Sequence, residues 1–133
     1  MATGQSKVVA SFTGPAKRDL SAFQYCAMTL DTDGYIDYAD STVPTEVLGI
    51  LQNKPSAAGA EAEVAILGTS LFVMGATAAV SQMDKLGSEA ASYRGVKVTA
   101  NLAKYFCFAL EDATTDGDII EVLLIGGTAS ISA

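Results

Sequence analysis

Four pairs of closely spaced carboxylates are the residues of this chain that could perform acid–base chemistry. They are Asp31/Asp33, Glu61/Glu63, Glu111/Asp112 and Asp116/Asp118. Two carboxylates can serve as acid and base when their environments separate their pKa values. Each of these pairs lies in an expected turn or on the alternating outer face of an expected strand. The pattern therefore predicts solvated surface charges rather than a catalytic pair.

Other catalytic groups are also scarce. Histidine is absent from the sequence, which removes the commonest general base near neutral pH and the commonest zinc ligand. Cys26 and Cys107 each lie inside an apolar run and have no histidine partner that could activate them. We expect two buried thiols, and a disulfide between them is the alternative. The sequence contains no glycine-rich phosphate loop, and it predicts no enzyme, no cofactor and no metal site.

Two short motifs have a possible chemical meaning. Residues 31–34, Asp-Thr-Asp-Gly, could begin a calcium loop, but the closing glutamate of such a loop is missing. A hairpin turn is therefore the preferred interpretation. Asp84 and Lys85 are similar to the modified hairpin of lipoyl carrier domains, although the flanking residues differ from that pattern. A solvated loop lysine is expected, and a carrier role for Lys85 is an alternative that a mass shift would reveal.

Composition and charge restrict the class of protein. The 133 residues have the length of one domain, and half of them are hydrophobic. The net charge is −7, with 8 basic and 15 acidic residues. This charge argues against nucleic acid and anionic membranes as partners, because phosphate binding requires clustered Lys or Arg. No signal peptide and no apolar run long enough for a membrane span are found, so synthesis in the cytosol is expected.

Residues 49–68, GILQNKPSAAGAEAEVAILG, organise the expected fold. A short apolar run is followed by a polar turn that contains Pro55, which cannot donate a backbone hydrogen bond. In the second half, Glu61 and Glu63 alternate with apolar residues, which places the carboxylates on one face of a strand. The segment therefore predicts a strand, a turn and a second strand.

Short apolar or alternating runs elsewhere predict further strands. They cover residues 23–30, 35–40, 69–73, 96–99, 105–110 and 119–125. The last two runs are apolar on both faces, so both faces must be covered by a barrel, a sandwich or a subunit interface. Helical spacing of Leu102, Tyr105, Phe106 and Ala109 is a competing interpretation, but the β-branched and aromatic content favours strands. The small residues 126–133 predict a mobile tail, in which Ile131 could dock.

The resulting fold prediction is a mainly β domain, a small barrel or β-tulip-like fold built from antiparallel hairpins. Residues 15–133 are expected to form this single domain, and residues 1–14 an extended N-terminal arm. The arm is small and polar with one apolar patch around Val8, Val9 and Phe12. Such a segment is either an arm that orders on a partner or a first edge strand.

Two parts of the sequence together resemble a known family. The first is Leu51-Gln52-Asn53, a proline, a Gly-Ala connector, Ala62-Glu63-Val64-Ala65 and Gly68, and the second is residues 109–113, 116–118 and 119–124. Their order and spacing, over about the last two thirds of the chain, resemble the small tailed-phage capsid cement (head decoration) proteins. The resemblance implies a structural virion protein, made in the host cytoplasm and bound to the outside of a phage head. It also implies a homotrimer whose partner is the major capsid protein.

The resemblance gives the apolar residues of the expected strands and arm a possible role. Val8, Val9 and Phe12 of the arm are expected to contact the capsid shell. Leu71, Phe72, Tyr105 and Phe106 are expected to contact sister subunits. Another virion surface protein, such as a spike or a tail-associated protein that binds a host surface, is the alternative function.

Overall fold

The computed structural model describes residues 7–39, 47–75, 79–89, 92–99 and 104–130. These residues form an all-β domain, which confirms the predicted mainly β, barrel-like fold. The strands are β1 (Val8–Pro15), β2 (Ala27–Leu30), β3 (Ile36–Tyr38), β4 (Gly49–Leu51), β5 (Glu61–Val73), β6 (Lys85–Ser88), β7 (Gly95–Lys97), β8 (Lys104–Ala109) and β9 (Ile119–Ser130). Within these ranges, no helix is long and apolar enough to cross a membrane.

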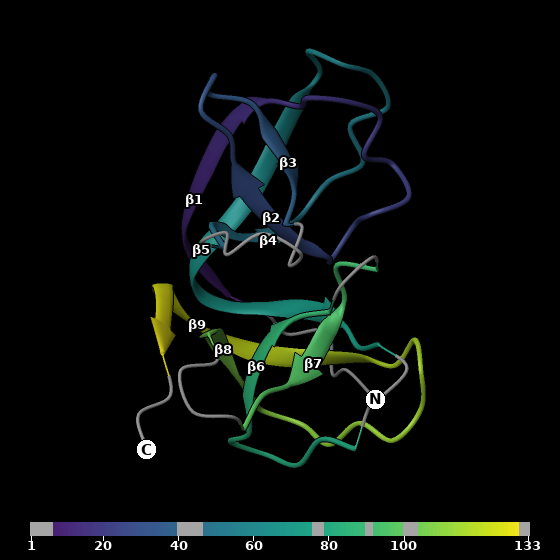
Figure 1. Ribbon diagram of the computed structural model, residues 1–133, viewed down its shortest axis with the longest axis vertical. Helices are drawn as coiled ribbons and strands as arrows, with labels where there is room; N and C mark the ends of the chain where they lie inside the picture. The colour runs from purple at the N-terminus through teal and green to yellow at the C-terminus, as the bar shows by residue number, and fades with distance from the viewer. Residues whose placement is uncertain (1–6, 40–46, 76–78, 90–91, 100–103, 131–133) are drawn as a thin grey trace.

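The strands pair antiparallel in one curled sheet, of which β5 is the longest member (Figure 1). The strand order is β3-β2-β4-β5-β9-β8-β6-β7, and β1 also pairs with β5. One edge of β5 carries β1 along residues 61–68. The other edge carries β4 at residues 64–65 and then β9 along residues 67–73. The first half of β5 therefore belongs with β1–β4, and its second half belongs with β6–β9.

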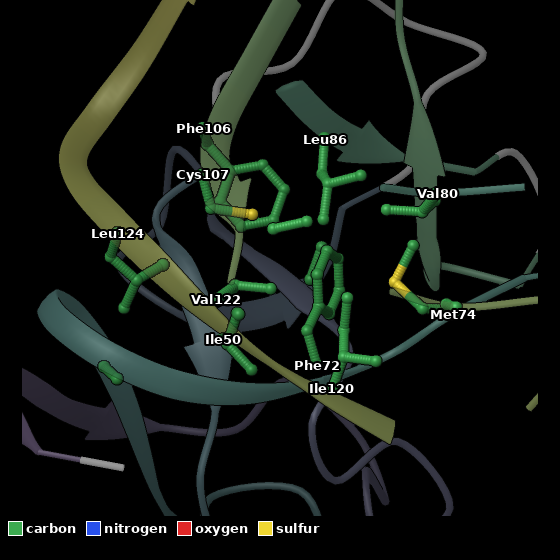
Figure 2. Close-up of a cluster of buried hydrophobic side chains, with 14 of the residues drawn as sticks. Ile50, Phe72, Met74, Val80, Leu86, Phe106, Cys107, Ile120, Val122 and Leu124 are labelled. Carbon is green, nitrogen blue, oxygen red and sulfur yellow. The ribbon is translucent and has the colours of Figure 1, made fainter. Parts of the chain in front are cut away.

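The interior consists of two clusters of buried apolar side chains that meet at β4. The first cluster lies among β5, β6, β8 and β9 and includes Phe72, Met74, Leu86, Phe106 and Ile120 (Figure 2). The second lies among β1–β5 and includes Leu20, Met28, Ile36 and Val64. Alternate residues of a strand point to opposite faces. Ile50 of β4 therefore joins the first cluster and Leu51 joins the second, and all three residues of β4 are buried.

The hairpin predicted from residues 49–68 is confirmed. Its two strands, β4 and β5, pair antiparallel. The Asn53 side chain holds the turn, because its amide donates to the Glu61 carbonyl at 2.9 Å and its oxygen accepts from the Glu63 N–H at 3.0 Å. Glu61 and Glu63 are exposed and the intervening Ala62 is buried, so the alternation in the sequence correctly gave the face of each side chain.

The expected end of this strand at Gly68 is wrong. Gly68 has a φ of 103°, and β5 continues through it to Val73. The pairing of β1 with β5 is irregular at this point. A Cβ atom on Gly68 would lie 2.4 Å from the carbonyl oxygen of Lys7 and 2.6 Å from the nitrogen of Val9. The glycine thus lets the backbone of β1 approach closely and lets β5 bend without ending.

The C-terminal segment also differs from the expectation of a mobile tail. β9 continues through Gly126 and Gly127 to Ser130, and Tyr105 of β8 pairs with Ala129. Small residues do not prevent a strand when a neighbouring strand supplies the hydrogen bonds. The helical interpretation of the preceding region is wrong for β8, while Leu102 and Ile131 lie outside the described residues.

The described part of the N-terminal segment is an edge strand. β1 spans residues 8–15, so the boundary expected between residues 14 and 15 falls inside it. The sequence left open an extended arm or an edge strand. Residues 8–15 form an edge strand, because β5 offers a full edge for pairing. Residues 1–6 of the expected arm are outside the described ranges.

Candidate interaction surfaces

The open edge of β1 is the first candidate surface. Among the described strands, β1 pairs with β5 alone. Its side chains are mostly exposed, including Val9 at 72%, Val8 at 39% and Phe12 at 36%. An edge strand with unpaired backbone groups and exposed apolar side chains is a template for another extended segment. The structure thus places the three residues predicted to contact a shell on a surface that a partner can reach.

The second candidate is the outward side of β5, β9, β8 and β6, which we name the outer sheet face. Cross-strand partners share a face, and the register pairs Leu71 with Glu121, Thr69 with Leu123 and Leu123 with Phe108. The apolar members are Leu67, Leu71, Val73, Tyr105, Phe108, Ile119, Leu123 and Ile125, and the polar members are Thr69, Lys85 and Glu121. All of these side chains are exposed or half-buried.

Only two of the four predicted subunit contacts lie on this face. Leu71 and Tyr105 are half-buried members of it, and their role stays a prediction. Phe72 and Phe106 are 0% and 2% exposed, and their rings meet edge to face at 5.3 Å inside the first core cluster. Side chains buried inside one chain cannot form a surface for another, so the interface prediction is wrong for these two phenylalanines.

A bulge in β8 explains which of its side chains point outward. The register with β9 shifts between Tyr105 and Cys107. Phe106 and Cys107 are both buried, whereas the rings of Tyr105 and Phe108 contact each other at 5.7 Å on the outer sheet face. A bulge re-aims side chains in this way.

Sequence reasoning missed six apolar members of the outer sheet face. They are Leu67, Val73, Phe108, Ile119, Leu123 and Ile125. The signal was present, because residues 119–125 are apolar at odd and even positions alike, which requires a cover on both sides. Glu121, the charged residue of this run, also marks the odd-numbered positions as the outward set.

An apolar groove lies beside these surfaces and has no evident chemistry. Its volume is about 260 Å³, and its lining residues are Thr29, Leu30, Val47, Leu48, Ile66 and 126–128. None of these side chains is charged, and the Thr128 hydroxyl accepts from the Val47 N–H at 3.0 Å. The described residues also contain no group of three or more Cys, Asp or Glu side chains that could hold a metal.

Asp31, a member of one carboxylate pair, stabilises a turn. Asp31 accepts from the N–H groups of Asp33 and Tyr35 at 2.9 Å each and pairs with Lys17 at 2.9 Å. The hydrogen bond from Lys17 and those from the turn lower the pKa of Asp31 below its ordinary value. These contacts confirm that residues 31–34 form a hairpin turn.

We expect Asp31 to make the stability of the fold depend on pH in the acidic range. Because its pKa is lower in the folded state, the ionised carboxylate stabilises the protein above the unfolded value of about 3.9. This contribution is lost as the pH falls through the lower folded value. Urea unfolding should therefore show that the free energy of unfolding falls less between pH 7 and pH 3 for Asp31→Asn than for the parent chain. Asp33→Asn is the control, and equal acid profiles for both variants would contradict the assignment.

The two cysteines are free and buried, as the sequence predicted. Burial raises the pKa of Cys26 to about 11 and raises the pKa of Cys107 as well. Both thiols are therefore protonated at neutral pH and are poor nucleophiles.

Lys85 does not lie at the tip of its turn. It is the first residue of β6, and its ammonium lies 5.5 Å from the centre of the Tyr105 ring. The neighbouring Asp84 pairs with Lys97 at 3.3 Å. A carrier lysine must swing freely, whereas Lys85 is half-buried, so this geometry gives the carrier alternative no support.

Comparison with known proteins gives an informative structural likeness. No family model matches the chain, and no curated protein matches it. A solved structure, the N base of the head fiber gp8.5 of bacteriophage phi29, is similar with a TM-score of 0.59 and 18% sequence identity. The likeness covers 92% of this chain and 98% of that one.

This likeness concerns the fold. At 18% identity the two chains share an architecture rather than a demonstrable set of functional residues. Nearly the whole chain takes part, so β1 through β9 belong to one common domain type. The comparison agrees with the barrel-like fold expected from the sequence.

Proposed function

We propose that this chain is a structural protein of a tailed-phage virion and is attached to the outside of the head. The observation that carries the proposal is the fold shared over 92% of the chain with a head-fiber base. The sequence resemblance to head decoration proteins points to the same location. Asp31, which stabilises a turn, and the two buried thiols agree with a structural role.

Within this proposal, the specific role is that of a capsid cement protein. Copies of the domain, as homotrimers, would sit where major capsid proteins meet and hold neighbouring subunits together. Each contact adds modest binding energy, and simultaneous contacts multiply its effect. The open edge of β1 supplies a contact of the right kind, because an extended capsid segment could pair with it along residues 8–15.

The charge of the chain fits this location. A net charge of −7 keeps the protein soluble before it is added to heads. It also disfavours binding to the packaged DNA, whose phosphates repel acidic surfaces.

A second role is the base of a head appendage, such as a fiber or spike. The similar solved structure favours this role, because it is the base of a head fiber. A cement protein must strengthen the shell, whereas an appendage base only has to attach to it. Head stability therefore separates the two roles.

The proposal is tested with undecorated phage heads and the purified chain. We expect saturable co-sedimentation at a copy number that matches the capsid lattice. Heating the decorated and bare heads then separates the roles: a higher temperature of DNA release supports cement, and no change supports an appendage base. Absence of binding to the heads would contradict the virion proposal.

β1 should be the part of the chain that attaches to the head. Val9→Asp places a charge on the most exposed apolar residue of β1 and should weaken head binding at least about tenfold, or ~1.4 kcal/mol. Met83→Asp is the matched control, because Met83 is 61% exposed and lies in a turn away from β1. Equal binding of the two variants, measured by co-sedimentation, would rule out β1 as the contact.

A further inference from the structure

We infer that copies of this chain contact one another through the outer sheet face, with Lys85 of one copy against Glu121 of the next. The inference deepens the proposed function, because it assigns a two-fold contact between copies of this surface protein, separate from the contacts within a homotrimer. Of the residues predicted from the sequence to contact sister subunits, it keeps Leu71 and Tyr105 and leaves out the buried Phe72 and Phe106.

The apolar character of the face is the first argument. Leu67, Ile119 and Leu123 are 41%, 39% and 38% exposed on neighbouring strands. They adjoin Leu71, Val73, Ile125 and the Phe108–Tyr105 ring pair. A contiguous apolar surface of this kind, bordered by polar groups, is typical of a protein–protein contact.

The distribution of charge indicates that the partner is another copy. The whole chain carries a net charge of −7, so two copies repel each other over most of their surfaces. On the outer sheet face, however, one lysine and one glutamate balance. The nearby Glu111 carboxylate, which accepts a hydrogen bond from the Glu121 N–H at 2.8 Å, keeps its negative charge at the border of the face. This face is therefore a place where two copies can meet without strong repulsion.

Lys85 and Glu121 make the face complementary to itself. The Lys85 ammonium lies over the Tyr105 ring. Neither Lys85 nor Glu121 has an ion-pair partner among the described residues. Lys85 pairs with Phe108, which pairs with Leu123, two residues from Glu121. The two charges are thus separated by about 10 Å across the strands and about 7 Å along them. A second face can be placed so that each charge meets its opposite.

The size of the face predicts a reversible association. It presents about a dozen side chains, whereas a standard interface uses roughly 20–30 residues on each side. Self-association in solution should therefore depend on concentration and become strong only when a lattice brings copies together.

Charge reversal tests the inference without phage heads. Sedimentation velocity up to about 1 mM chain should show self-association of the parent. Lys85→Glu and Glu121→Lys should each weaken it about tenfold, because like charges then meet. The double variant should restore it. Lys54→Glu and Glu61→Lys, which change exposed charges elsewhere, are the matched controls.

Leu123→Glu supplies a second test at the centre of the face, where an extra charge should abolish association. Circular dichroism and thermal unfolding confirm that each variant is folded. A parent that stays monomeric, or a double variant that stays as weak as the singles, would overturn the inference. Head binding is measured separately, so a chain that binds heads but does not self-associate would leave the proposed function intact.

Discussion

Gly49→Ala is expected to destabilise the fold by at least about 3 kcal/mol, an unusually large effect for one added methyl group. The new Cβ atom would lie 1.9 Å from the carbonyl oxygen of Ala65 and 2.9 Å from the Val64 side chain. The oxygen belongs to the backbone of β5, so rotation of a side chain cannot relieve the contact. β4 would have to move away from β5, and both core clusters meet at β4.

Gly14→Ala in β1 is the matched control for this substitution. There the new methyl group would meet only side-chain atoms, at 3.3 Å from the Phe12 ring and 3.5 Å from Ile36. Restricting the unfolded chain favours alanine by roughly 0.4–1 kcal/mol, which offsets this crowding. Urea unfolding followed by circular dichroism should separate the variants clearly. Similar stability losses for both would show that β4 is not held tightly between the clusters.

The parts of the fold set by local chemistry could be predicted from the sequence. Pro55 and Asn53 mark the turn of the central hairpin, and the Asn53 side chain, just after β4, indeed bonds two backbone groups of β5. Asp31 and Gly34 mark a second turn, in which Gly34 has a φ of 88°. These residues act through neighbours close in sequence, so the signal is available without a structure.

The bend of β5 could not be predicted in the same way. A glycine can end a strand, start a turn or admit a bulge, and the choice at Gly68 depends on β1, some sixty positions earlier in the chain. The extension of β9 to Ser130 likewise depends on β8. Both the bend of β5 and the length of β9 depend on pairing with a strand distant in the sequence, and the pattern of a single segment does not reveal such pairing.

Only part of the candidate interface could be predicted from the sequence, and the reason is related. Strands that are apolar on both faces have no alternation to mark their inner side. The sequence therefore gave the correct strands but could not separate Leu71 from Phe72 or Tyr105 from Phe106. The bulge in β8 shifts the alternation further, since it turns two successive residues inward.

Phe72→Ala tests this correction and should cost about 3–5 kcal/mol of stability. The Phe72 ring is fully buried, contacts Phe106 edge to face and lies against β7, where a Cβ on Gly95 would come within 2.9 Å of it (Figure 2). Truncation leaves a cavity that this packed surrounding cannot close. The aromatic contact itself contributes roughly a further 0.5–1.5 kcal/mol.

Leu71→Ala, one position away, should behave differently because its side chain is half-buried on the outer sheet face. We expect a loss of about 1 kcal/mol or less in the isolated chain, together with weaker self-association at high concentration. Unfolding at low protein concentration separates the two effects, since the face is then uncovered. If Phe72→Ala kept full stability and weakened only self-association, Phe72 would be an interface residue after all. We expect Phe72→Ala to reduce stability and Leu71→Ala to reduce self-association, because successive residues of a strand point to opposite faces. In β5 one face lies in the core and the other points toward a sister copy.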